Sequence, residues 1–384
     1  MKIAIISHLY PGVKTLAEGT FIQEQATELR HYAQVDVFVP TVRAIPSTAR
    51  YRINHTALVD EQNTRRVRYL SFPQKKFPGI IRRNLASEMV PRLENGGYNV
   101  VHVNWAYPDS LIIPELKKKK ILTLLHIHGS DWYKTRQPKK LAALIEESLF
   151  CTDRILVVGR RLREDICSVY PALRPKIHLH HNAVDCNLFA IPVDKNLSKA
   201  HLNWDIKKRH VLNVANVRFE KGTDVLVKAI LAHPFPDTHF HIIGNSYLDD
   251  YQREITSLIE KHALPVTIHP PVAHHELKKY MHAADLFVLP SRKEGFGLAL
   301  AEAGSTGLPL ISTKSGGPED IINATNGLLV SPGSSEELAK ALAYLLELAG
   351  EYDANEIRKD IVDRFDKGLM TKKLLEHYNQ IMNA

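Results

Sequence analysis

The chain has 384 residues, 44% of them hydrophobic and 24% charged, with a formal net charge of +8. That length suits two ordinary domains, and the composition is typical of a soluble globular protein. No apolar run reaches the roughly 18–20 residues that a membrane helix needs, and the apolar part of MKIAIISHLYPG is too short for a signal peptide. The cysteines Cys151, Cys167 and Cys186 form no CxxC, which favours reduced thiols in the cytoplasm.

The positive charge is confined to the first half of the chain. Residues 1–190 contain 28 Lys and Arg against 17 Asp and Glu, and the remainder contains 22 against 25. Two interpretations are equally compatible with this excess: a peripheral contact with anionic lipid or acidic glycan, for example at the inner membrane face, or a solvated face. Nucleic acid is disfavoured because no recognition motif accompanies the charge. The basic residues concentrate at Arg65, Arg66, Arg68, Lys75, Lys76, Arg82, Arg83, Lys117–Lys120, Lys134, Arg136, Lys139 and Lys140.

In the first half, short apolar runs alternate with helical segments, which predicts an α/β protein with a parallel sheet. A loop containing Pro11 and Gly12 precedes a helix over Gly19–Arg30. Residues 41–80 are polar, basic and weakly patterned, and we expect a long excursion with short strands there, as part of an acceptor site. The predicted strands are Ile3–Ser7, Val35–Val39, Val100–Val103, Leu122–Ile127, Arg154–Val158 and Ile177–Leu179.

The second half repeats this alternation after Ala183–Asn203, which lacks a clear pattern and predicts a linker. Amphipathic helices are expected over Ser334–Leu348 and Lys367–Asn383. No G-x-G-x-x-G follows the first strand, which disfavours an NAD-dependent dehydrogenase. The predicted strands are Val211–Ala215, His239–Ile243, Val266–His269, Leu286–Leu289, Leu308–Ser312 and Gly327–Val330.

Residues 283–333 contain two strand–glycine loop–helix junctions. The first runs from the strand Leu286–Leu289 through Gly295, Phe296 and Gly297 into a helix that begins at Leu298, and the second places Ser315–Pro318 before another expected helix. Helix N-termini attract anions, and glycines let the backbone approach a phosphate closely. Glu294 and Glu302 flank this predicted anion site. Because carboxylates suit sugar and ribose hydroxyls, the stretch predicts a nucleotide sugar as the ligand.

The spacing Glu294-x7-Glu302, with Gly295-Phe296-Gly297 after the first glutamate, resembles the glutamate motif of retaining GT-B glycosyltransferases, family four. This is the glycogen-synthase-like group that uses nucleotide-sugar donors. The resemblance implies two Rossmann-like domains with parallel sheets facing an interdomain cleft. It implies an acceptor-side domain over 1–188, a nucleotide-sugar-binding domain over 189–365, and a C-terminal helix, 366–384, that crosses back to the first domain.

Asn216–Gly222 follows the first strand of the second half and resembles the family motif Arg-x4-Lys-Gly. Lys221 and Gly222 match, and a lysine before a helix start is well placed for a diphosphate. Asn216 stands where the family has arginine. Arg218 could reach the same phosphates, or it could be a solvent-facing loop charge.

His128, followed by Gly129, matches a strand-end histidine of the family that faces the donor sugar. His126 shares its face of the strand, but no third ligand stands at useful spacing, so zinc is disfavoured. Gly19 opens the first helix, and the resemblance places that loop near the donor phosphates. Five further histidines, His178, His180, His181, His274 and His275, show no grouping, and we expect them on the surface or in the core.

The resemblance implies transfer of a sugar from a nucleotide-diphosphate sugar to a hydroxyl acceptor, with retention and with neither a cofactor nor a metal. The acceptor would be a glycan, a lipid-linked glycan or a polysaccharide precursor. Lys221 and the amides near Gly297 and Leu298 would stabilise the leaving diphosphate, Glu294 would bind the donor sugar, and Glu302 the ribose. His128, Lys221 and Glu294 are the expected catalytic residues. Two alternatives stay open: a GT-B epimerase, and a catalytically silent nucleotide-sugar-binding subunit.

Overall fold

The computed structural model describes residues 1–12, 19–43, 63–72, 77–135, 138–245, 250–348 and 350–384. It divides into two compact units, one formed by Met1–His181 with Gly368–Ala384 and the other by Asn182–Lys367. The sequence placed the first boundary after residue 188, whereas contacts in the structure place it after His181. Within the described residues, no helix combines the length and the apolar character needed to cross a bilayer.

Unit 1 is built on a seven-stranded parallel sheet with the order β3-β2-β1-β4-β5-β6-β7. Its central strands are apolar on both faces: Ile3, Ile5 and Ile6 of β1 have no exposed surface, as expected for a sheet covered by helices on both sides. The strands are β1 (Lys2–Ile6), β2 (Gln34–Arg43), β3 (Thr64–Leu70), β4 (Val100–Asn104), β5 (Thr123–Ile127), β6 (Arg154–Val157) and β7 (Ile177–Leu179). The helices are α1 (Thr20–Leu29), α2 (Pro78–Asn95), η3 (Asp109–Ile112), α3 (Ile113–Lys118), α4 (Ser130–Tyr133), α5 (Lys139–Cys151), α6 (Arg160–Val169) and η4 (Pro171–Lys176).

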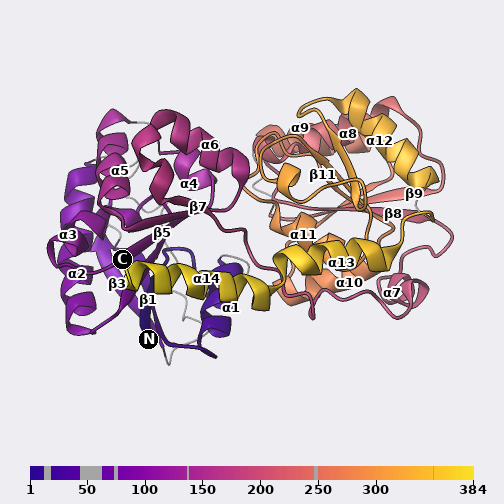
Figure 1. Cartoon of the computed structure of the whole chain (residues 1–384). Coiled ribbons are helices and arrows are strands. Elements are labelled where there is room, and N and C mark those ends of the chain that lie inside the picture. The colour runs from indigo at the N-terminus through magenta and orange to yellow at the C-terminus, as the bar shows by residue number, and fades with distance from the viewer. Residues whose placement is uncertain (13–18, 44–62, 73–76, 136–137, 246–249, 349) are drawn as a thin grey trace. The chain divides into compact units, whose positions relative to one another are not determined.

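The C-terminal helix α14 (Lys367–Met382) packs in unit 1 from Gly368 onward (Figure 1). Leu374 and Tyr378 of α14 join one core cluster with Ile22 of α1 and with β1. Tyr378 is fully buried, and its hydroxyl lies 2.7 Å from Nδ1 of His102 on β4. The last helix is therefore part of the core of the first unit, although it follows the second unit in sequence.

Unit 2 is built on a six-stranded parallel sheet with the order β10-β9-β8-β11-β12-β13. The strand order reverses between β8 and β11, the position at which open α/β sheets bind ligands beyond their carboxyl ends. The strands are β8 (Arg209–Val214), β9 (Thr238–Ile243), β10 (Val266–His269), β11 (Leu286–Leu289), β12 (Leu310–Thr313) and β13 (Gly327–Val330). The helices are α7 (Lys195–His201), η5 (Phe219–Lys221), α8 (Thr223–Ala232), α9 (Asp250–Lys261), η6 (His274–Glu276), α10 (Leu277–Ala283), α11 (Leu298–Ser305), η7 (Pro318–Asp320), α12 (Ser335–Glu347) and α13 (Ala354–Phe365).

Every strand that the sequence predicted is present, and α/β architecture with parallel sheets is confirmed. Much of the predicted excursion over 41–80 lies outside the described residues, but β3 falls within it and pairs with β2 over seven residues. The expected linker Ala183–Asn203 is wrong in part, since it contains α7, which Asp194 caps by accepting a hydrogen bond from Leu197 N at 3.0 Å.

The helix expected after Ser315–Pro318 is also wrong: only the three-residue turn η7 forms there. The side chain of Glu319 turns back to accept a hydrogen bond from Gly316 N at 2.8 Å. Asn326 then accepts from Asn323 N at 2.9 Å, so the chain turns directly into β13. The second of the two predicted anion-binding helix starts therefore does not exist.

Candidate functional site

The loops that follow β8 and β11 lie together at the carboxyl edge of the unit 2 sheet. Gly222 has a φ of +69°, and a Cβ built on it would lie 2.0 Å from the carbonyl oxygen of Pro290. Glycine is therefore required for the two loops to approach. Arg292 N donates to the carbonyl of Glu220 at 2.8 Å and links the same loops.

Lys221 and Glu294, predicted separately, are in contact. Nζ of Lys221 lies 2.6 Å from Oε2 of Glu294, and the side chains are 31% and 13% exposed. Ser291 donates its hydroxyl to the same carboxylate oxygen at 3.3 Å. Glu294 is also fixed through its backbone, because its amide donates to Ser315 O at 3.1 Å and its carbonyl accepts from Gly317 N at 2.9 Å. The pair is thus held between three loops.

A second ion pair, which the sequence analysis missed, braces this arrangement. Arg292 donates to Asp224 through its two terminal guanidinium nitrogens, at 2.7 and 2.8 Å, and its guanidinium lies 4.0 Å from the centre of the Phe219 ring. The hydroxyl of Tyr251 donates to Asp224 at 2.7 Å. Burial raises the pKa of Asp224, but the hydrogen bonds from Arg292 and Tyr251 outweigh it and lower the pKa to about 2. No sequence spacing indicates a contact between residues so far apart in the chain.

Glu302 lies inside α11 and is almost fully buried. Its Oε1 lies 2.6 Å from Nε2 of His274, the first residue of η6, and the two side chains are 4% and 15% exposed. The prediction that His274 has no grouping is therefore wrong. A buried carboxylate is costly unless it is paired, and His274 provides that partner.

The N-terminus of α11 lies between the two glutamates. Gly297 caps it with a φ of +98°, and the helix runs for eight residues from Leu298. Its first amides carry partial positive charge and are suited to an anion. Phe296, a predicted donor-binding residue, is 2% exposed and packs against Phe365, so only its backbone and that of Gly295 can face a ligand.

Asn216 and Arg218 occupy different surroundings. The side-chain oxygen of Asn216 accepts a hydrogen bond from Asn245 N at 3.1 Å, which ties the loop after β8 to the loop after β9. Gly244 allows this approach, since a Cβ there would lie 2.1 Å from Ala215 O. Arg218 is exposed at the start of η5. Asn216 therefore binds the neighbouring loop, where the family motif has arginine.

In unit 1, the strand order reverses between β1 and β4, and Gly19 and His128 lie in loops near that edge. Gly19 has a φ of +71°, and a Cβ on it would lie 2.3 Å from Leu9 O. His128 follows β5; its Nε2 lies 3.1 Å from Oδ1 of Asn104, and its amide donates to Asp131 at 3.1 Å. Part of the loop before Gly19, residues 13–18, lies outside the described residues.

The ring of His128 belongs to a group of aromatic side chains. Its centre lies 4.4 Å from those of Trp105 and His126. Burial lowers the pKa of His126 to about 3, although a hydrogen bond to the carbonyl of His180 opposes the shift. The pKa of buried His180 is also lowered well below its usual value, by burial and then by its histidine neighbours. The prediction that His180 belongs to no group of side chains is therefore wrong.

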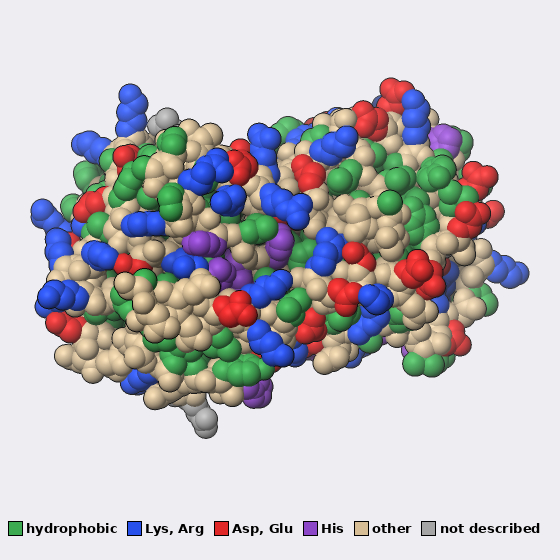
Figure 2. Space-filling view, viewed as in Figure 1, with side chains coloured by type: hydrophobic (Ala, Val, Ile, Leu, Met, Phe, Trp, Pro, Cys, Tyr) green, Lys and Arg blue, Asp and Glu red, His purple; other side chains and the backbone are tan. Residues whose placement is uncertain are grey.

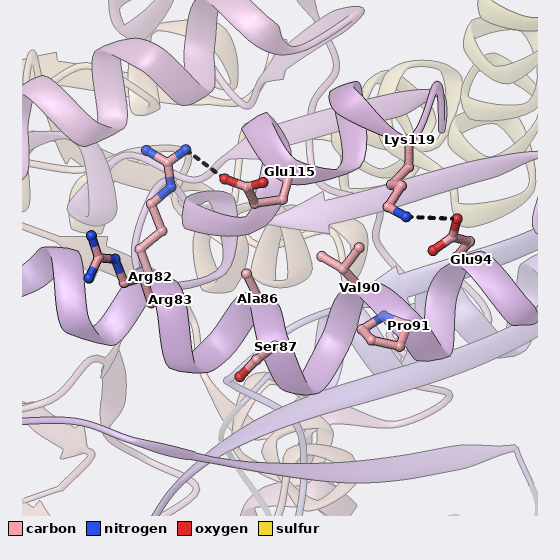
Figure 3. A pocket seen from close by; sticks show the side chains of 9 residues that line it. All are labelled: Arg82, Arg83, Ala86, Ser87, Val90, Pro91, Glu94, Glu115 and Lys119. Carbon is pink, nitrogen blue, oxygen red and sulfur yellow. Dashed lines mark hydrogen bonds and ion pairs between the residues drawn. The ribbon is translucent and has the colours of Figure 1, made fainter.

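These histidines do not form a metal centre: across the described parts of the chain, no three His, Cys, Asp or Glu side chains are grouped as ligands. The pocket in Figure 3 lies elsewhere on unit 1, between α2 and α3. Two of the cations that line it form ion pairs, Arg82 with Glu115 at 3.2 Å and Lys119 with Glu94 at 3.1 Å. None of the predicted site residues lines it.

Two family models match the chain. The model described as Glycosyltransferase Family 4 matches residues 19–188, and the model described as Glycosyl transferases group 1 matches residues 194–362. The chain belongs to the GT-B glycosyltransferases of family four. This confirms the resemblance drawn from Glu294, Glu302 and Lys221, and the two matched ranges together span both units.

One curated relative and two solved structures agree with this membership. The D-inositol 3-phosphate glycosyltransferase of Xylanimonas cellulosilytica is 26% identical over 309 residues, 73% of each chain. The sucrose-phosphate synthase of Thermosynechococcus elongatus superposes with a TM-score of 0.81 at 20% identity, covering 100% of this chain and 99% of that one. HepE of Anabaena, in complex with UDP-glucose, gives 0.74 at 17% identity, covering 99% and 100%. The structures confirm the GT-B fold, and the chain is a glycosyltransferase.

Proposed function

We propose that this glycosyltransferase transfers a sugar from a nucleoside-diphosphate sugar to a hydroxyl acceptor with retention and without a metal ion. The observation that carries the proposal is a set of paired side chains at the carboxyl edge of the unit 2 sheet. Lys221 contacts Glu294, and His274 contacts Glu302. The N-terminus of α11 lies between the two glutamates. One cation, one set of helix amides and two oriented carboxylates match a diphosphate with hydroxyl-bearing groups on both sides.

In this proposal, Lys221 and the first amides of α11 stabilise charge that develops on the leaving diphosphate. Since they supply positive charge there, the step does not require a metal. The bond from the anomeric carbon to the diphosphate oxygen breaks as the acceptor oxygen bonds on the same face, and the departing phosphate oxygen takes the acceptor's proton. No general base is assigned among the residues of this chain.

Glu294 binds hydroxyls of the transferred sugar, and Glu302 binds those of the ribose. With Nζ of Lys221 on Oε2 of Glu294, the remaining lone pairs of that carboxylate can accept from sugar hydroxyls. His128 is proposed as the unit 1 residue that acts at the donor sugar, and Gly19 as part of its phosphate loop. Asn104 and Trp105 hold the His128 ring in place.

A screen of UDP, ADP and GDP sugars for thermal stabilisation tests the donor. A ligand bound only by the native state stabilises it by about 2.7 kcal/mol at one hundred times its Kd. The stabilising donor is then incubated with and without candidate acceptors, with and without chelator. Acceptor-dependent transfer that survives chelation supports the proposal. Product from donor alone would identify an epimerase, and binding without turnover a silent subunit.

The acceptor side of the proposal concerns the basic residues of unit 1. Figure 2 shows that Asp and Glu side chains are interspersed among the Lys and Arg side chains of the visible face. Arg82, Lys117, Lys118 and Lys119 each form an ion pair with a carboxylate, whereas Arg65 and Arg68 of β3 are exposed. Ion pairing therefore neutralises part of the basic excess, and Lys75, Lys76 and Arg136 lie outside the described residues.

Sedimentation with lipid vesicles separates an interaction surface from a solvated face. An anionic-lipid contact predicts binding to anionic and not to neutral vesicles, with binding that falls as salt is raised, because charges are screened within about 8 Å at physiological ionic strength. Arg65→Ala with Arg68→Ala should weaken that binding. Equal binding to both kinds of vesicle, or binding to neither, would mean that the basic residues form only a solvated face.

A further inference from the structure

The buried pair of His274 and Glu302 joins two segments that meet only in the folded unit. Glu302 comes from α11, after β11, and His274 comes from η6, after β10. At 2.6 Å, and with the carboxylate 4% exposed, the contact is a short hydrogen bond to a charged acceptor. The fold itself therefore brings these two side chains into contact.

The His274 ring is held on its other side by Phe189, with ring centres 5.3 Å apart. The backbone of Phe189 is anchored in turn, since its carbonyl accepts from the hydroxyl of Ser305 at 2.8 Å and from the guanidinium of Arg358 at 3.0 Å. Ser305 is the last residue of α11. The imidazole therefore packs against a residue whose backbone is hydrogen-bonded to the helix carrying Glu302.

This arrangement orients the carboxylate and leaves part of its hydrogen-bonding capacity unused by His274. A carboxylate has about four acceptor positions, and the bond to His274 occupies one on Oε1. The remaining positions can accept hydrogen bonds from two neighbouring hydroxyls. A side chain that is oriented before binding loses less freedom when the ligand arrives.

We infer that His274 is a positioning residue that orients Glu302 toward the ribose diol of the donor, and so sets a preference for ribonucleotides over 2′-deoxyribonucleotides. The inference rests on the proposed ribose-binding role of Glu302. It adds that discrimination at the 2′-hydroxyl depends on a residue that need not touch the nucleotide.

Calorimetry with UDP, ADP and their 2′-deoxy counterparts tests this in His274→Ala, His274→Gln and His275→Ala. Wild type should bind one ribonucleotide at least tenfold more tightly than its deoxy form, since a hydrogen bond to a charged acceptor accounts for about a factor of ten or more. His274→Ala should reduce that ratio toward one. His274→Gln keeps an N–H donor, so this variant should retain the affinity ratio of the wild type. His275, 69% exposed beside the pair, is the matched control and should leave the ratio unchanged.

The ratio of two affinities does not depend on the fraction of folded protein, so reduced stability of His274→Ala cannot imitate the result. His274→Ala with Glu302→Gln should show the same ratio as Glu302→Gln alone. A ratio that His274→Ala leaves unchanged, or a wild type that does not discriminate the 2′-hydroxyl, would overturn the inference. A wild type that binds neither nucleoside diphosphates nor their sugars would instead overturn the proposed function.

Discussion

The two units hold their site residues by different means. In unit 2, two pairs of charged side chains come from separate loops, Lys221 with Glu294 and Arg292 with Asp224, and His274 is hydrogen-bonded to Glu302. In unit 1, His128 lies among aromatic and histidine rings and the amide side chain of Asn104. One site is organised mainly by opposite charges and the other by packing of aromatic and histidine rings.

The difference between the two sites follows from the cost of placing an unpaired charge in each of them. Lys221 and Glu294 of unit 2, with side chains 31% and 13% exposed, can exchange one partner for a ligand while staying partly solvated. In unit 1, the rings of Trp105, His126 and His102 are buried: His102 is completely inaccessible, and burial lowers its pKa well below the usual value. Ionisation there would place uncompensated charge in a medium of low polarity. Acid should therefore affect the two sites differently.

The largest expected effect is on stability in acid. The pKa values of buried His102, His126 and His180 lie below the unfolded value, so these groups stabilise the fold above pH 6.5, and that contribution is lost as pH falls toward the folded values. These three groups together should lower the unfolding free energy by about 4 kcal/mol for each pH unit below about 6.5, roughly 1.4 for each group. Other histidines whose pKa values are lowered by burial, such as His377 of unit 1 and His241 of unit 2, add to that slope. The Asp224 carboxylate, with a pKa of about 2, should lose its contribution to the unfolding free energy only as the pH falls below 3.8.

Urea unfolding between pH 7 and 4.5 measures this slope. His377 is half-buried beside Arg154, and burial lowers its pKa to about 4, so His377→Gln should make the slope shallower. His31→Gln, at an exposed position of the same unit, is the control and should match wild type. A stability that does not change between pH 6.5 and 5 would show that the unit 1 histidines are not held neutral.

The next largest effect concerns the ion pair nearest the proposed chemistry. Lys221→Ala removes a charge aimed at the leaving diphosphate, and loss of such a donor costs on the order of 10²–10³ in turnover. Donor affinity should fall less than turnover, because the charge on the diphosphate grows as the bond breaks. Lys228→Ala, which removes an exposed partner of Asp224, serves as the control. Near-normal turnover in Lys221→Ala would remove this lysine from the mechanism.

The smallest effect separates the two glutamates. Glu302→Gln should weaken both the nucleoside diphosphate and its sugar by about tenfold, since a hydrogen bond to a charged acceptor is worth roughly 1.5–3 kcal/mol. Glu294→Gln should leave nucleoside diphosphate affinity nearly unchanged and reduce transfer, because its proposed partner is the transferred sugar. Calorimetry and a transfer assay on both variants measure this. Equal losses of nucleotide affinity would show that the division of roles is wrong.

Local patterns in the sequence were sufficient for the strands, for most helices and for the family. An apolar run such as Leu286–Leu289 is a buried strand wherever it lies in a parallel sheet, and the glutamate motif has a constant spacing along one strand–loop–helix unit. The sequence was misleading where competing side-chain bonds decide the backbone, as in the turn after Gly317, where Glu319 bonds back to Gly316.

Tertiary structure alone decided which residues of the site meet. Lys221 and Glu294 are 73 residues apart, Asp224 and Arg292 are 68 apart, and His274 and Glu302 are 28 apart. Each pair forms because β8, β11 and the end of β10 reach one edge of a sheet whose strand order differs from the chain order. Sequence periodicity reports which face of an element is buried, but it carries no information on which element lies beside it. The partner of a charged loop residue is therefore determined by the strand order of the folded sheet.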